Sequence, residues 1–210
     1  MSSKTPERLP RGQVLTSKWP VLTYGDTPAV DRASWTFRCF GAVGKEVAWT
    51  WTEFLALPRV VIISDVHCVT RWSRFDNRWA GVAVRELLSH ADVRPEAVAV
   101  MAHTEKGYTT NIPLADLLDP DVLLAYEHDG EALPPEHGGP CRLVVPTLYF
   151  WKSAKWIRAF ELLDVNAPGF WESNGYHLHA DPWNEERYSD QETDAMQRMR
   201  AEASRRLRRR

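Results

Sequence analysis

Cys68 is the residue of this sequence best placed to do chemistry. It lies in the run DVHCVTRWS at 65–73, directly after the apolar stretch Val60-Val61-Ile62-Ile63. Such a stretch predicts a buried strand, which would deliver the cysteine to the start of an irregular loop. A thiolate at that position could ligate a soft, redox-active transition metal. Taken alone, the run favours the plainer interpretation, in which a free cysteine packs as a small apolar side chain.

A second chemically rich segment runs from residue 137 to residue 156. It reads HGGPCRLVVPTLYFWKSAKW, with two glycines beside His137 that permit a close backbone approach to a bound group. Arg142, Lys152 and Lys155, together with the Ser153 hydroxyl, offer donors suited to a phosphate. Arginine can hold a phosphate bidentately, whereas lysine acts as a point charge. The alternative is that each of these charges lies at a strand end and faces solvent.

Two histidines, His177 and His179, flank Leu178. Alternate residues of a strand lie on one face, so a strand here would present both imidazoles together, a spacing that some metal sites use. Because no third ligand of obvious geometry stands nearby in the sequence, we expect a polar strand end rather than a second metal site.

Composition narrows the class of protein. The 210 residues include 44% hydrophobic and 26% charged residues, which is ordinary for a globular domain with a proper core. The formal net charge of −2 gives no reason to expect nucleic acid as a partner. Three cysteines without a CxxC pair argue against a disulfide framework or structural zinc and favour a reducing compartment. We find no apolar leader and no membrane-spanning run, so we predict a cytoplasmic protein without membrane contact.

Short strands and a few short helices are expected along the chain. We predict strands at 35–40, 60–63, 97–101, 142–149 and 156–165, and helices at 50–57, 81–91 and 113–118. Thr50 and Glu53 have capping-box spacing, and Pro58 should end the helix that they begin. Asp129-Gly130 suits a type I′ turn, so residues 122–126 and the segment after the turn should form a hairpin. This mixture predicts an α+β fold with mixed, mostly antiparallel pairing.

The sequence divides into three parts. Residues 1–20 are rich in proline and predict an extended lead-in, and residues 21–190 should form the folded domain. Residues 191–210 are helix-prone and end in RRLRRR, so we expect a basic tail that is helical or disordered. Such a tail could contact an acidic partner, but a solvated chain end is the expected role.

Four motifs occur in an order and at a spacing that identify a family. They are HCVTRWS at 67–73, HGGPCRLVVP at 137–146, KSAKW at 152–156 and GFWESNGYH at 169–177. Together they resemble the molybdopterin-binding domain of the sulfite oxidase family, which includes the catalytic subunit of bacterial methionine sulfoxide reductases. The resemblance runs from about Leu22 to Tyr188 and includes the eleven-residue step from Arg142 to Ser153. It implies that residues 21–190 adopt the family's α+β fold.

The resemblance also implies an activity and a set of site residues. We expect a molybdenum-dependent oxidoreductase that binds Mo-molybdopterin and moves an oxygen atom to or from a small sulfur- or nitrogen-containing substrate. Cys68 matches the cysteine that ligates molybdenum, and Tyr176 matches a tyrosine that stands beside the metal. The positions that match residues holding the pterin and its phosphate are Thr23, Tyr24, Thr104, His137, Arg142, Ser153, Ala154 and Lys155.

This sequence also departs from the family. Sulfite oxidases carry an arginine five residues after the cysteine, where this chain has Ser73, and a second arginine where this chain reads Val21-Leu22-Thr23-Tyr24. Arg71 could replace one of them in catalysis or could be a surface charge. Without that pair, sulfite is a doubtful substrate. The haem motif and the dimerisation domain of larger members are also missing, so we expect a separate electron-transfer partner and leave the oligomeric state open.

Two alternatives to an enzyme are compatible with the same sequence. One is a protein of the same fold that carries or senses molybdopterin without turnover. The other is an interaction module that keeps the fold alone and acts through its basic tail.

Overall fold

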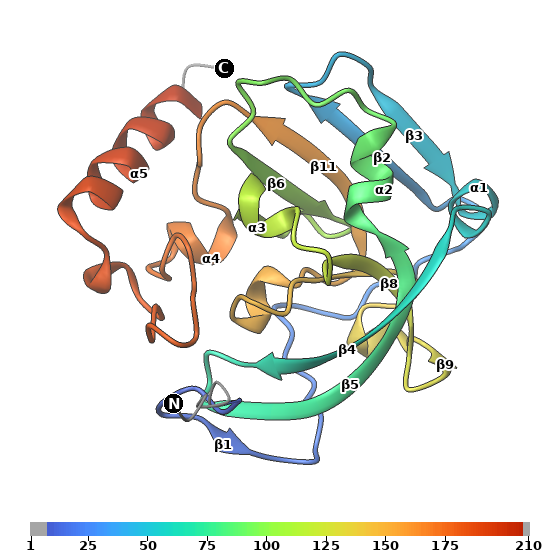
Figure 1. Cartoon of the computed structure of the whole chain (residues 1–210), viewed down its shortest axis with the longest axis horizontal. Coiled ribbons are helices and arrows are strands. Elements are labelled where there is room, and N and C mark those ends of the chain that lie inside the picture. Colours follow the sequence, from blue (N-terminus) through green and yellow to red (C-terminus); the bar gives the residue numbers. More distant parts are fainter. Residues whose placement is uncertain (1–7, 208–210) are drawn as a thin grey trace, which may run out of the picture.

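Two β-sheets form the frame of the protein, in a computed structural model that describes residues 8–207 (Figure 1). The expected lead-in and tail reach into residues 1–7 and 208–210, which lie outside the described residues. The first sheet contains β1 (Val14–Leu15), β4 (Arg59–His67), β5 (Trp72–Ala83), β8 (Leu123–His128), β9 (Glu131–Ala132) and β10 (Arg142–Val144). The second contains β2 (Thr36–Gly41), β3 (Val47–Thr50), β6 (Ala99–Thr104), β7 (Thr109–Pro113) and β11 (Ile157–Leu163).

Short helices connect the strands. The α-helices are α1 (Trp51–Leu55), α2 (Val84–Ser89), α3 (Leu114–Leu117), α4 (Phe170–Ser173) and α5 (Asp194–Leu207). Single 3₁₀ turns are η1 (Pro135–His137), η2 (Phe150–Lys152) and η3 (Ser189–Gln191). No helix within residues 8–207 is both long and apolar enough to cross a membrane.

Strand pairing is mixed, as the sequence predicts. In the first sheet the order is β1-β5-β8-β10, with β4 on β5 and β9 on β8. In the second it is β3-β2-β11-β6-β7. The β1–β5 and β2–β11 pairs are parallel, and the other pairs are antiparallel. Figure 1 shows β4 and β5 as a long curved ribbon below the second sheet, with α5 at the opposite side from β3.

Local sequence signals explain several elements. The Thr50 side chain accepts a bond from the Glu53 amide and the Glu53 carboxylate accepts one from Thr50, which is the expected capping box of α1. Asp129 and Gly130 have φ angles of 51° and 90° between β8 and β9, as the predicted type I′ hairpin turn requires. The strand before Cys68 is present, because β4 ends at His67. The prediction that it is buried was wrong, since Val61 and Ile63 are 41% and 65% exposed.

Other elements differ from the sequence predictions. The helix expected at 81–91 spans only α2, since residues 81–83 complete β5. At Gly81 the strands β5 and β8 approach so closely that a Cβ would lie 2.0 Å from the Leu124 carbonyl oxygen. Glycine allows this close approach, so the residue belongs to the sheet. The strand expected at 142–149 ends at Val144, two residues before Pro146, which has no N–H for strand pairing. We did not predict β7 or most of β5.

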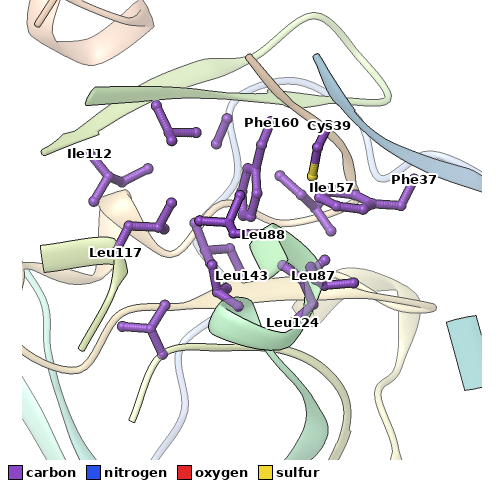
Figure 2. Packing of buried hydrophobic residues seen from close by; sticks show 14 of the residues in the cluster. Phe37, Cys39, Leu87, Leu88, Ile112, Leu117, Leu124, Leu143, Ile157 and Phe160 are labelled. Carbon is purple, nitrogen blue, oxygen red and sulfur yellow. The ribbon is translucent and has the colours of Figure 1, made fainter. Parts of the chain in front are cut away.

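The main hydrophobic core lies between the two sheets. Figure 2 shows Phe160 and Ile157 of the second sheet pointing toward Leu143 and Leu124 of the first, with Leu87 of α2 among them. Cys39 and Cys141 are fully buried in this cluster, as expected for packing residues. Each buried side chain of Leu, Ile or Phe size contributes about 1.5–3 kcal/mol, so the core fixes the relative position of the sheets.

Candidate active site

A pocket of about 500 Å³ collects most of the predicted site residues. Its walls come from residues 19–24, the turn between β4 and β5, residues 106–108, residues 137–156 and residues 170–176. The predicted residues that line it are Thr23, Tyr24, Cys68, His137, Arg142, Ser153, Ala154, Lys155 and Tyr176. Arg71 and Thr104 do not line it. Arg71 is exposed, and the Thr104 hydroxyl donates to the Tyr108 carbonyl at 2.9 Å.

Cys68 occupies the first position of the turn that joins β4 to β5. Its N–H donates to the Trp72 carbonyl at 2.8 Å, and its carbonyl accepts from the Arg71 N–H at 3.0 Å, which closes the turn. Arg71 takes a φ of 74° to complete it and is exposed, with its guanidinium next to Gly12. The side-chain amide of Gln13, just before β1, donates to the Cys68 carbonyl at 3.0 Å. These bonds to the backbone of Cys68 hold the cysteine at the pocket wall.

The Cys68 thiol is nearly buried but faces the pocket. Its Sγ lies 3.1 Å from the Thr70 hydroxyl, within hydrogen-bond distance for sulfur. Burial raises the pKa of the thiol, while hydrogen bonds from Thr70 and the positive charge of Arg187 oppose the rise. A bound cation would replace the thiol proton, so these neighbours favour the thiolate that a metal requires.

One end of the pocket is basic. The buried Arg142 guanidinium donates to the carbonyls of His137 at 2.8 Å and Ser153 at 2.7 Å. Lys155 Nζ donates to the Thr23 hydroxyl at 2.6 Å and to the Glu136 carbonyl at 2.8 Å. All of these acceptors are neutral oxygens. Among residues 8–207, the bonds that hold Arg142 and Lys155 in place thus go to neutral oxygens, while the negative charge of Glu136 acts on Lys155 without a hydrogen bond between the two side chains.

The pKa values at the basic end follow from this arrangement. Burial lowers the pKa of Arg142 to about 9, and burial together with repulsion by Arg142 lowers the pKa of Lys155 to about 8. The pKa of His137 falls to about 4, first through burial and then through both cations. Buried cations that repel one another are stabilised by an added anion, so this end fits a phosphate group.

Two expectations for the 137–156 segment need correction. Gly138 and Gly139 do not line the pocket, and the space beside them is filled by the protein itself. A Cβ at Gly139 would lie 2.2 Å from the Leu133 carbonyl oxygen. Lys152, which we considered as a phosphate ligand, is fully buried with its Nζ 2.7 Å from the Glu172 carboxylate. Lys152 therefore has a structural role, because it forms a buried ion pair with Glu172, twenty residues later in the sequence.

Aromatic side chains line much of the pocket, including the basic end, where the Arg142 guanidinium lies 4.2 Å from the Phe150 ring. The Tyr176 ring lies 5.1 Å from Trp151 and 5.1 Å from Trp171, and the Tyr24 ring lies 4.7 Å from Phe170. Tyr176 also packs against the buried cluster that contains Cys68. Burial raises the pKa of the Tyr176 phenol, so its hydroxyl stays protonated at neutral pH and can donate a hydrogen bond.

Arg187 is a site residue that the sequence did not reveal. It is 3% exposed, its guanidinium donates to the Val69 carbonyl next to Cys68, and it stacks 4.8 Å from the Tyr149 ring. Its Nε and one terminal nitrogen have no hydrogen-bond partner among residues 8–207. Arg187 lies in the charged run Glu185-Glu186-Arg187, which is typical of a surface, so no sequence signal marks it.

The His177–His179 segment is not a strand. Tyr176 forms a single bridge with Tyr188, after which the chain turns and His177 Nδ1 accepts from the amides of His179 and Ala180. His179 instead contacts Asp116 at 3.3 Å and Glu186 at 2.8 Å. Within the described part of the chain, no three His, Cys, Asp or Glu side chains form a group that could hold a metal ion.

Comparisons with known proteins identify the family of this chain. Residues 24–171 match the family described as "Oxidoreductase molybdopterin binding domain". The chain belongs to this family. It is 46% identical to the uncharacterized oxidoreductase YuiH of Bacillus subtilis (strain 168) over 87% of this chain and 92% of that protein.

More distant relatives widen the comparison. The putative protein-methionine-sulfoxide reductase subunit YedZ1 of Azospira oryzae is 33% identical over 73% of this chain and 59% of that protein. In the structure of the sulfane dehydrogenase SoxCD from Paracoccus pantotrophus, the matching region has a TM-score of 0.60 and 25% identity, and covers 66% of this chain and 40% of that one.

Family membership settles several expectations. The sulfite oxidase-type resemblance and the α+β molybdopterin-binding fold are confirmed. The chain is a molybdopterin-dependent oxidoreductase, and its cofactor is Mo-molybdopterin. The residues at the pocket fit this cofactor, since a thiol, the buried cation Arg142 with the half-buried cation Lys155, and a phenol line one space.

Proposed function

We propose that this enzyme transfers an oxygen atom to or from a small sulfur- or nitrogen-containing substrate, with Cys68 as the protein ligand of molybdenum. One observation carries the proposal: Cys68, Tyr176 and the basic group of Arg142, Lys155 and His137 line the same pocket. A soft sulfur ligand suits a redox-active metal, and buried cations suit the phosphate of a pterin.

Each residue then has a definite task. Arg142 and Lys155 hold the phosphate from one side, with Ser153, Ala154, His137, Thr23 and Tyr24 around the rest of the cofactor. Molybdenum bound to its pterin supplies two-electron oxygen-atom chemistry. Cys68 orients and tunes the metal from the β4–β5 turn. Tyr176 donates a hydrogen bond to the oxygen that moves, because its phenol keeps its proton. Arg71 and Thr104 are left out of the proposed site, because their side chains lie outside the pocket.

We also propose a partner and a location. Electrons enter or leave through a separate electron-transfer protein; the relative YedZ1 is named as a subunit of a reductase, which supports a partner of this kind. Cys39, Cys68 and Cys141 are all free thiols, which suits the reducing cytoplasm.

Metal analysis and substitution of Cys68 test the proposal. Protein from a molybdenum-replete host should contain about one molybdenum per chain and turn over at least one of sulfite, S-oxides and N-oxides in a dye-linked assay. Cys68→Ser should lower turnover more than about 100-fold, beyond the loss expected for an outer-shell residue, and should change the metal's spectrum while the protein stays folded.

Cys39→Ala is the matched control, because Cys39 lies in the core between the sheets and away from the pocket. It should keep molybdenum and turnover at some cost in stability. Full activity in Cys68→Ser would show that the ligand is wrongly assigned. Stoichiometric molybdenum without turnover on any of the three substrate classes would favour a carrier or sensor of the cofactor instead.

A further inference from the structure

Strand β4 lies at an edge of the first sheet. It pairs with β5 along its length and with no other strand among residues 8–207. In the same part of the chain, the main-chain N–H and carbonyl groups of residues 59–63 that point away from β5 bond to no other main-chain group. A strand with a free edge of this kind is a template on which another strand can pair.

The middle of β4 is apolar on both faces. Alternate side chains share a face, and one face consists of Arg59, Val61, Ile63 and Asp65. Val61 is 41% exposed and Ile63 is 65% exposed. Val60 and Ile62 are half-buried and pack against the cluster that contains Trp79. Proteins commonly protect an edge with a charge or a proline, and residues 60–63 contain neither.

Two antiparallel copies of β4, aligned with Ile62 at the centre, match one another residue by residue. In this register Ile62 faces its own counterpart, and Val61 faces the partner's Ile63. Arg59 faces the partner's Asp65, so opposite charges meet at both ends of an apolar middle. The free edge of β4 is therefore complementary to itself.

The charges that flank β4 strengthen this match. Arg59 pairs with Glu127 at 2.7 Å, and Asp65 pairs with Arg8 at 2.7 Å. When Arg59 faces the partner's Asp65, the four side chains alternate in sign along the contact. Like charges would not lie opposite one another at either end, which is the condition for a specific contact between charged strands.

The backbone of β4 is regular over the stretch that would pair. Ser64 lies opposite Asn77 and Val66 lies opposite Arg74, so two steps on β4 match three on β5. The extra residue of this bulge belongs to β5 and leaves β4 itself without an insertion. Residues 59–65 thus offer about 23 Å of continuous edge, at about 3.3 Å per residue.

We propose that two copies of this chain associate through β4, in an antiparallel pair that is centred on Ile62 and joins their first sheets. The two-fold axis lies six positions before Cys68, or about 20 Å along the strand. No residue from 59 to 65 lines the pocket, so the contact leaves the pocket uncovered. The contact is at the small end of specific interfaces, so its dissociation constant is in the micromolar range.

Sedimentation velocity of the full-length, molybdenum-loaded protein tests the association. Between about 1 and 200 μM, the dimer fraction should rise with concentration. Ile63→Lys should raise the dissociation constant about 10-fold or more, because its ammonium would be buried against the partner's Val61. Val98→Lys is the matched control, since Val98 is 50% exposed and lies just before β6 in the second sheet. It should associate like the parent, and circular dichroism should show that both variants are folded.

Charge exchange tests the register. Arg59→Glu alone and Asp65→Lys alone each place like charges at both ends of the pair, so each should weaken self-association about 10-fold or more. Mixed in equal amounts, the two variants should form a heterodimer with nearly the parent's affinity, because each changed side chain then faces one of opposite sign. Local damage from either substitution would not be repaired by mixing.

Cross-linking locates the two-fold axis. Ile62→Cys should form a disulfide between two chains under mild oxidation with copper phenanthroline, because this position faces its own counterpart. Val60→Cys is the control, since its counterpart lies about 13 Å further along the partner strand. The native cysteines are buried and should contribute little background.

The possible outcomes decide the proposal. A chain that stays monomeric at every concentration would overturn it, as would a dimer that Ile63→Lys leaves intact. A mixture of the two charge variants that associates no more tightly than each alone, or equal cross-linking at positions 60 and 62, would contradict the antiparallel register. Rescue by mixing, together with selective cross-linking of Ile62→Cys, would establish the β4 contact.

Discussion

At the scale of single residues, Arg187 connects two walls of the pocket. Its guanidinium donates to the carbonyl of Val69, next to Cys68. Its own carbonyl accepts from the His177 N–H at 3.1 Å, next to Tyr176. One residue thus links the segment of the proposed metal ligand to the segment of the proposed hydrogen-bond donor. We regard it as a positioning residue, since it bonds to residues of the pocket wall and does not itself line the pocket.

Replacing Arg187 with methionine should loosen the Cys68 turn. We expect kcat/KM to fall about 10- to 100-fold, as for outer-shell residues of metal sites, and the free energy of unfolding to fall by about 1–3 kcal/mol. Arg187→Lys should recover part of both losses, because lysine keeps one donor and the charge. The decisive measurement is the electron paramagnetic resonance spectrum of the half-reduced metal. If Arg187→Met lowers stability and leaves that spectrum unchanged, the residue is merely structural.

Sequence motifs predicted the residues that share the pocket better than the residues that support them. Cys68, Arg142, Lys155 and Tyr176 could be found because their spacing matches a family. Arg187 could not, since its burial depends on Val69, 118 positions earlier in the chain. The interpretation of Lys152 went wrong for a similar reason, because its carboxylate partner becomes a neighbour only in the folded state.

At the scale of elements, hydrogen bonds and ion pairs connect the polar segment after Tyr176 to neighbouring elements. Arg200 of α5 donates to the carbonyls of Glu172 and Tyr176, and pairs with Glu192. His179 bridges Asp116 of α3 and Glu186. These bonds replace the strand that the sequence suggested for this segment. The capping box of α1 was predictable because it is local. The bonds of Arg200 and His179 were not, because they join distant parts of the chain.

The His179 bridge makes stability depend on pH. Hydrogen bonds to Asp116 and then Glu186 raise its pKa to about 10, from about 6.5 in the unfolded chain. A raised folded-state pKa gives stability that is fully present below pH 6.5 and is lost as pH rises through 10. The side chain is 33% exposed, so screening limits the contribution to about 1 kcal/mol.

Urea unfolding of His179→Gln should show this dependence. The variant should be about 1 kcal/mol less stable than the parent at pH 6, and the difference should shrink toward zero above pH 10. His90→Gln, at the exposed C-terminus of α2, is the control and should change stability by less than about 0.5 kcal/mol at either pH. A deficit that grows with pH would contradict the bridge.

At the scale of the whole molecule, a buried ion pair joins the pocket to the second sheet. Lys152 of η2 donates to Asn111 of β7 at 2.8 Å and to the Leu178 carbonyl at 2.9 Å, and contacts Glu172 of α4. Thr110 and Trp151 also donate to the Glu172 carboxylate. Three segments far apart in the sequence therefore meet at one fully buried centre.

Removing one member of this pair should be costly. Lys152→Met leaves the Glu172 charge buried, so we expect the free energy of unfolding to fall by about 3–5 kcal/mol. Lys152→Met combined with Glu172→Gln should recover more than half of that loss, because a neutral amide still accepts from Thr110 and Trp151. Chemical denaturation of the single and double variants measures both. A double variant no more stable than the single one would refute this account.

The sequence predicted the positions of several strands better than their pairing and their lengths. Alternating apolar residues and turn signals identified β2, β8 and β9, because those patterns are local. The parallel pairing of β1 with β5 and of β2 with β11 was not visible, since it joins strands 58 and about 120 positions apart. The length of β5 was missed because polar Asp76 and Asn77, together with Gly81, interrupt its apolar pattern.

The pocket draws its lining from positions as early as Trp19 and as late as Tyr176. While the chain is being synthesised, no shorter portion emerging from the ribosome contains every wall of that space. In addition, β2 lacks its parallel neighbour until β11 has been made, and such long-range pairing forms slowly. The complete pocket can therefore receive a pterin only after translation has passed Tyr176.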